Sequence, residues 1–165
     1  LPCAIRVWPP QPHLPPGAHV PGGEGQAQRR LGRSRVGQRL VRQRVGQQAF
    51  RQAMLDYWGG ACAVTGVALA QALRASHAKA WALCVTDAER LDVYNGFLLS
   101  ANLDALFDAY LVTFDDEGAL LVSCAVSTEQ RGRLGLHVGQ KLRWLDARHQ
   151  SYLAFHRSKC DWLVG

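Results

Sequence analysis

The chain has 165 residues, a mass of 18.2 kDa and 48% hydrophobic residues, which suits one domain, or one domain with a tail. No apolar run is long enough to span a membrane, and six of the seven prolines lie within residues 1–20, which argues against a signal-peptide core there. The net charge of +6 is uneven, because residues 1–51 carry +8 and residues 52–165 carry −2. The positive charge therefore comes from the first third of the chain alone, and the remainder is expected to be a mildly acidic globular sequence. The first residue is not methionine, so the natural start of the chain is left open.

The five cysteines argue against two common kinds of scaffold. Their number is odd and no pair has the spacing C-x-x-C, so neither a disulfide framework nor a zinc site built from paired cysteines is favoured. Cys62 and Cys124 are interpreted as small core residues in strands. We expect a reducing, cytoplasmic setting.

Residues 1–43 are expected to form a disordered tail rich in proline, glycine and arginine, and residues 44–163 a folded domain. Residues 1–28 offer little apolar surface to offset the entropy of ordering. Residues 29–44 contain seven arginines, which fits either a solvated basic linker or an arm that follows phosphates.

The folded part is predicted to begin with a helix over residues 47–58, ended by Gly59 and Gly60. A short strand-like segment, a short helix, an extended segment and a polar loop follow, over residues 62–65, 67–73, 75–81 and 85–92. The next predicted elements are an apolar segment, a capped helix, a hairpin with an acidic glycine-containing turn, and a terminal segment that is either a helix or a mixture of strand and helix, over residues 94–100, 102–110, 111–124 and 148–163. This order predicts an α+β fold.

Four polar residues in the centre of the chain are candidates for chemistry, and each also has an ordinary structural explanation. Asp104 and Asp108 share a helix face, where they would bind a hard cation or simply suit the helix N-terminus and the solvent. His77 is either a general base or a structural or exposed histidine. Asn95, which precedes Gly96, either forms a type I′ turn or braces the loop that carries the histidine.

The order and spacing of these four residues are a more specific indicator of function than any one of them alone. Asn95 follows His77 by 18 residues, and Asp104 and Asp108 follow Asn95 by 9 and 13. The surrounding blocks read GACAVTG at 60–66, ASHAKAW at 75–81, ERLDVYNGFLLS at 89–100, LDALFD at 103–108 and FDDEG at 114–118. In these blocks the chain resembles the HNH nuclease family, and most closely its bacterial restriction-type branch. The resemblance covers roughly residues 42–159.

The resemblance implies a ββα-metal finger, flanked by helices and a β-hairpin, that hydrolyses phosphodiester bonds in DNA with the help of a divalent ion. His77 falls on the family's general base and Asn95 on the asparagine that orients the base or its loop. Asp104 and Asp108 fall on the two helical metal-ligand positions, and their carboxylates favour Mg²⁺ or Mn²⁺ over Zn²⁺.

The expected partner of such a finger is double-stranded DNA; no membrane partner is expected, and a homodimer is left open. Candidates for phosphate contacts are basic residues of the finger and of the arginine-rich arm, namely Lys79, Arg90, Arg42 and Arg44.

Several residues depart from the family pattern. Ser76 stands where many relatives have a stronger ligand, Ala78 and Ala80 replace a branched residue and a proline, and Tyr110 stands where a helix-ending glycine is usual. These departures keep open a catalytically impaired, HNH-fold nucleic-acid-binding module. A third hypothesis, a structural domain with a basic tail and no activity, requires the match of these blocks to the family pattern to be accidental.

Overall fold

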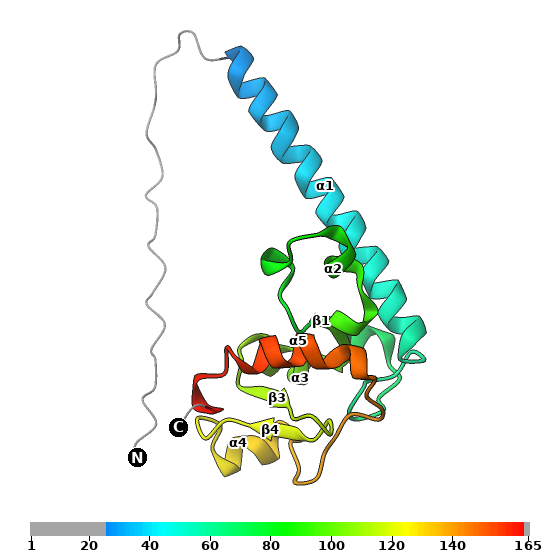
Figure 1. The fold of residues 1–165 in the computed structure, drawn as a ribbon, viewed down its shortest axis with the longest axis vertical. Coiled ribbons are helices and arrows are strands. Elements are labelled where there is room, and N and C mark those ends of the chain that lie inside the picture. The colour runs from blue at the N-terminus through cyan, green and yellow to red at the C-terminus, as the bar shows by residue number, and fades with distance from the viewer. Residues whose placement is uncertain (1–25, 164–165) are drawn as a thin grey trace. The chain divides into compact units, whose positions relative to one another are not determined.

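The computed structural model describes residues 26–163 and divides the chain into two compact units, Leu1–Val45 and Gly46–Gly165. The tail expected over residues 1–43 lies outside the described part up to residue 25, and from Gln26 onward the chain is helical. Helix α1, Gln26–Tyr57, therefore begins before the boundary expected at residue 44 (Figure 1). Its glutamine, arginine and leucine residues have favourable helix propensities. No helix within residues 26–163 combines the length and the apolar character that crossing a bilayer requires.

The helix predicted over residues 47–58 is confirmed as the C-terminal part of α1. Phe50, Met54 and Trp58 recur at four-residue intervals and are almost completely buried, so this face of the helix packs into the core. Gly59 and Gly60 follow with φ angles of 63° and 67°, a left-handed conformation that ends the helix as predicted.

The centre of the second unit is a pair of strands backed by a helix. Strands β1, Leu73–His77, and β2, Gly96–Ser100, are antiparallel, and His77 pairs with Gly96. Helix α3, Ala101–Asp108, follows β2 directly and packs against both strands (Figure 1). Its inner face carries Leu103 and Phe107, both buried. This arrangement confirms the α+β prediction.

A second antiparallel pair, β3 (Val112–Phe114) and β4 (Leu120–Val122), confirms the predicted hairpin. Helix α4, Thr128–Arg133, follows β4, and helix α5, Gln150–Arg157, packs against β3. The rings of Phe97, Phe107 and Phe114 meet in the core with centroid separations of 5.4–5.8 Å. These rings connect the first strand pair and α3 to the second pair.

Three local predictions were wrong because tertiary contacts decide the local structure. Residues 62–65 form a turn rather than a strand, although Cys62 is buried as predicted. Cys124 is exposed in a turn instead of buried in a strand. The expected loop over residues 85–92 contains helix α2, Asp87–Leu91, which is capped by the Thr86 hydroxyl accepting from the Glu89 N–H.

Asn95 and Gly96 do not form the hairpin turn that this dipeptide favours. Asn95 ends a short 3-10 turn, and Gly96 begins β2 with an extended φ of −162°. A Cβ atom on Gly96 would lie 2.5 Å from Phe50 Cζ and 2.7 Å from the Ser76 carbonyl oxygen. Close packing beside the end of β1, rather than turn geometry, therefore requires glycine here.

Candidate active site

His77 is the last residue of β1, and its ring is held on three sides. It stacks on Phe50 with a centroid separation of 3.7 Å and meets the edge of Trp81 at 5.6 Å. Its Nε2 lies 2.9 Å from the carbonyl oxygen of Arg90. Because a carbonyl oxygen only accepts hydrogen bonds, Nε2 carries the proton and Nδ1 keeps its lone pair. Burial lowers the pKa of His77, so the ring is neutral at pH 7 and Nδ1 is able to take a proton.

Asn95 is completely buried and fixes the loop that follows His77. Its Oδ1 accepts from the backbone N–H of Lys79 at 2.8 Å, while its Nδ2 donates to the carbonyls of Lys79 at 3.2 Å and Glu89 at 2.9 Å. Glu89 directly precedes Arg90, whose carbonyl holds the His77 ring. The asparagine therefore ties together both segments that set the orientation of His77.

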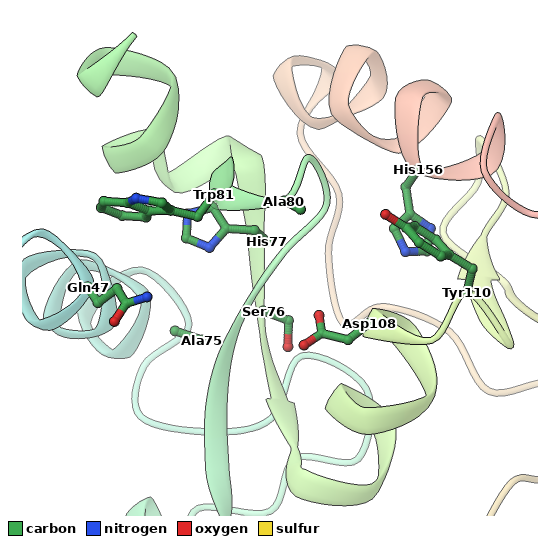
Figure 2. A pocket seen from close by; sticks show the side chains of 9 residues that line it. All are labelled: Gln47, Ala75, Ser76, His77, Ala80, Trp81, Asp108, Tyr110 and His156. Atoms are coloured by element: carbon green, nitrogen blue, oxygen red, sulfur yellow. The ribbon is translucent and has the colours of Figure 1, made fainter. Parts of the chain in front are cut away.

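The two aspartates of α3 lie on the face of the helix that meets β1. The Ser76 hydroxyl donates to Asp104 Oδ1 at 2.6 Å, and the Asp108 carboxylate points toward Ser76 (Figure 2). The pKa of Asp108 is raised by partial burial of its carboxyl group and by the negative charge of Asp104. One turn of α3 and the end of β1 thus bring two acidic groups and one hydroxyl together.

His77 and Asp108 face a common cavity of about 400 Å³. Residues from α1, from β1 and the loop after it, from the end of α3 and from α5 line it (Figure 2): Gln47, Ala75, Ser76, His77, Ala80, Trp81, Asp108, Tyr110 and His156. The cavity lies within the second unit. The structure brings His77 and Asp108 to one cavity, whereas Asn95 and Asp104 are not among its lining residues: Asn95 holds the loop after β1, and Asp104 accepts from the Ser76 hydroxyl.

The donor atoms of this site fit a hard divalent cation better than zinc. Asp104, Asp108 and Ser76 offer oxygen only, which suits Mg²⁺ or Mn²⁺, and a cation would relieve the repulsion that raises the pKa of Asp108. Within residues 26–163 no three His, Cys, Asp or Glu side chains gather as a metal-binding group. Two carboxylates suffice for Mg²⁺ when water and substrate phosphate complete its coordination.

The basic residues proposed for phosphate contact have different surroundings. Lys79 pairs with Glu89 at 2.7 Å. Arg90 donates to the Trp81 carbonyl at 3.3 Å and pairs with Asp87 at 2.8 Å, so both cations support the loop after β1. Their part in DNA binding stays a prediction. Arg42 and Arg44 are exposed residues of α1 in the first unit.

Two cavity residues, His156 and Tyr110, were not predicted as part of the site. His156 is buried, donates from Nε2 to the Phe107 carbonyl at 3.0 Å and accepts at Nδ1 from the Thr113 hydroxyl, 2.9 Å away. Burial lowers its pKa to about 4. Tyr110 was noted only as an unusual helix end. Tyr110 lies two residues after Asp108, whereas His156 reaches the cavity through the packing of α5 against β3, which no local pattern reveals.

Comparison with known proteins supports this region as a family domain. The sequence model of the HNH endonuclease family matches residues 62–115. This range begins at the turn before β1 and ends just after β3, so it contains His77, Asn95, Asp104 and Asp108. No curated protein matches the chain.

Proposed function

Because residues 62–115 form a domain of the HNH endonuclease family, we propose that this chain hydrolyses phosphodiester bonds in DNA with the help of a divalent cation. The observation that carries the proposal is the state of His77. Its Nε2–H is engaged by the Arg90 carbonyl, its pKa is lowered by burial, and its ring faces the cavity that Asp108 lines. A neutral imidazole that is held in one tautomer and faces a cavity also lined by an acidic group is suited to act as a general base.

In the proposed reaction, Nδ1 of His77 takes a proton from water while the water oxygen bonds to phosphorus. The bond from phosphorus to the leaving oxygen breaks, and that oxygen takes a proton from solvent. Asn95 keeps the base in place through Lys79 and Glu89. Asp104 and Asp108 would hold the cation, which when bound polarises the phosphodiester and stabilises the charge on the leaving oxygen.

A labelled DNA duplex and a supercoiled plasmid test this proposal directly. Cleavage is expected in Mg²⁺ or Mn²⁺, none in EDTA, and little in Zn²⁺, because the donors are oxygen atoms. Analysis of the new ends distinguishes hydrolysis from other strand breakage. Efficient cleavage in EDTA would contradict the proposed role of the two aspartates.

A second candidate function is an HNH-fold module that binds nucleic acid with impaired catalysis. It is favoured by the small number of acidic ligands: within the described residues no third His, Cys, Asp or Glu joins Asp104 and Asp108, and Asp104 already accepts from Ser76. Specific DNA binding without cleavage in any divalent cation would support this alternative.

The family match does not identify the substrate, the branch of the family, the location or the assembly of this chain, and these are proposals. We propose double-stranded DNA as the substrate, a bacterial restriction-type relationship and a cytoplasmic location. Phosphate contacts from Arg42, Arg44, Lys79 and Arg90 and assembly as a homodimer remain predictions.

A further inference from the structure

Tyr110 holds a backbone conformation that L side chains disfavour. Its φ is 56°, and it is the only residue other than glycine with a positive φ in the described part of the chain. The Tyr110 N–H donates to the Phe107 carbonyl, and the Leu111 N–H to the Leu106 carbonyl, both at 2.9 Å. This pair of bonds ends a helix with a left-handed residue that is usually glycine. A tyrosine is therefore kept here against a local conformational cost.

The conformation directs the tyrosine side chain into the cavity beside Asp108. Figure 2 shows Tyr110 on the side of the cavity opposite His77, with its hydroxyl directed inward. The ring leans on His156 with a centroid separation of 4.9 Å, and His156 is itself fixed by two hydrogen bonds. The Tyr110 carbonyl accepts from Trp162 Nε1 at 2.7 Å. Both the backbone and the ring of Tyr110 are thus held in place.

The Tyr110 hydroxyl is available as a donor. Among the described residues, none forms a hydrogen bond with it, although its carbonyl and ring are both engaged. The cavity lining contains no lysine or arginine, and the Ser76 hydroxyl already donates to Asp104. An anionic phosphodiester entering this cavity needs donors, and the Tyr110 phenol and the Gln47 amide are neutral groups that line it.

We propose that Tyr110 is a substrate-contacting residue whose hydroxyl donates a hydrogen bond to a non-bridging oxygen of the phosphodiester held in this cavity. The inference rests on the proposed function, because it takes DNA as the ligand of the cavity. A phenol supplies the contact without placing a second positive charge beside the cation site. This contact accounts for a tyrosine at a position whose backbone geometry favours glycine.

The test is the affinity of the full chain for a short DNA duplex, measured by fluorescence anisotropy in Ca²⁺ and in EDTA. Tyr110→Phe keeps the ring and its packing on His156, and we expect its Kd to rise about tenfold with an unchanged melting temperature. Tyr110→Gly, which suits the backbone, is expected to stay folded and to lose at least as much affinity. The matched control is Tyr94→Phe, since Tyr94 packs on Arg148 and does not line the cavity.

The outcomes separate this contact from the proposed hydrolysis. Wild-type affinity in Tyr110→Phe, or an equal loss in Tyr94→Phe, would overturn the contact. A wild-type chain that binds DNA but does not cleave it would contradict hydrolysis alone, and the two phenylalanine variants would still decide the contact. A wild-type chain that binds no DNA would overturn both.

Discussion

Replacing Asn95 by aspartate tests whether one buried amide organises the active site. The variant keeps the size of the side chain and its Oδ1 acceptor for the Lys79 N–H. It replaces the Nδ2 donor with an oxygen that faces the carbonyls of Lys79 and Glu89, 3.2 and 2.9 Å away. Each buried group left without a partner costs about 1–3 kcal/mol. We therefore expect the free energy of unfolding to fall by about 3 kcal/mol, or roughly 10 °C in melting temperature.

The same substitution is expected to lower cleavage at temperatures where the variant is folded. Glu89 and Arg90 are adjacent, and the Arg90 carbonyl sets the tautomer of His77, so loosening this segment releases the base. Calorimetric melting and single-turnover cleavage measure the two effects. Asn102→Asp is the matched control: its Nδ2 donates to the Leu134 carbonyl at 2.7 Å, but the site is exposed, so water replaces the lost bond, and an acidic group suits the first turn of α3. A variant Asn95→Asp that melts and cleaves like the wild type would refute this account of the loop.

Three further predictions concern the cation, acid stability and the basic arm. Asp104→Asn and Asp108→Asn should each weaken Mn²⁺ binding at least tenfold in titration calorimetry without DNA, and unchanged binding would exclude these ligands. The pKa of His156 is about 4 in the folded chain and about 6.5 when unfolded, so the unfolded state binds more protons between these values. Its contribution to stability is full above pH 6.5 and is lost as the pH falls toward 4, so that urea titrations at pH 7 and pH 5 should differ by roughly 2 kcal/mol from this group. In His156→Gln the free energy of unfolding should lose this part of its pH dependence, whereas the control His137→Gln, at an exposed site, should keep it. Equal pH dependence in both variants would contradict the assignment to His156. Arg42→Gln and Arg44→Gln should each reduce the slope of log Kd against log salt by about 1, and an unchanged slope would remove the arm from DNA binding.

Sequence patterns were sufficient where a local rule and the tertiary structure agree. The four-residue spacing of Phe50, Met54 and Trp58 predicted a buried helix face, and Gly59 marked its end. In these cases the residues that form the pattern also cause the structure: the apolar side chains are the ones that become buried, and the glycine is the residue that ends the helix.

Sequence patterns failed where a distant residue decides the local geometry. Gly96 looked like half of a hairpin turn, but Phe50 packs so closely that no side chain fits there. Helix α2 was missed although Thr86 and Glu89 have capping-box spacing, because five residues give little periodicity. The ion pair of Lys79 with Glu89 was likewise not predicted, and the phosphate contact of Lys79 stays a prediction.

The central claim is that His77 is the general base of a metal-dependent DNA nuclease. The most direct measurement is nicking of supercoiled plasmid in Mg²⁺ or Mn²⁺ by the wild type, His77→Ala and, as a matched control, His137→Ala at an exposed site. The account predicts cleavage by the wild type and His137→Ala, and none by His77→Ala, although that variant still folds and binds DNA. Equal cleavage by His77→Ala and the wild type would contradict the claim.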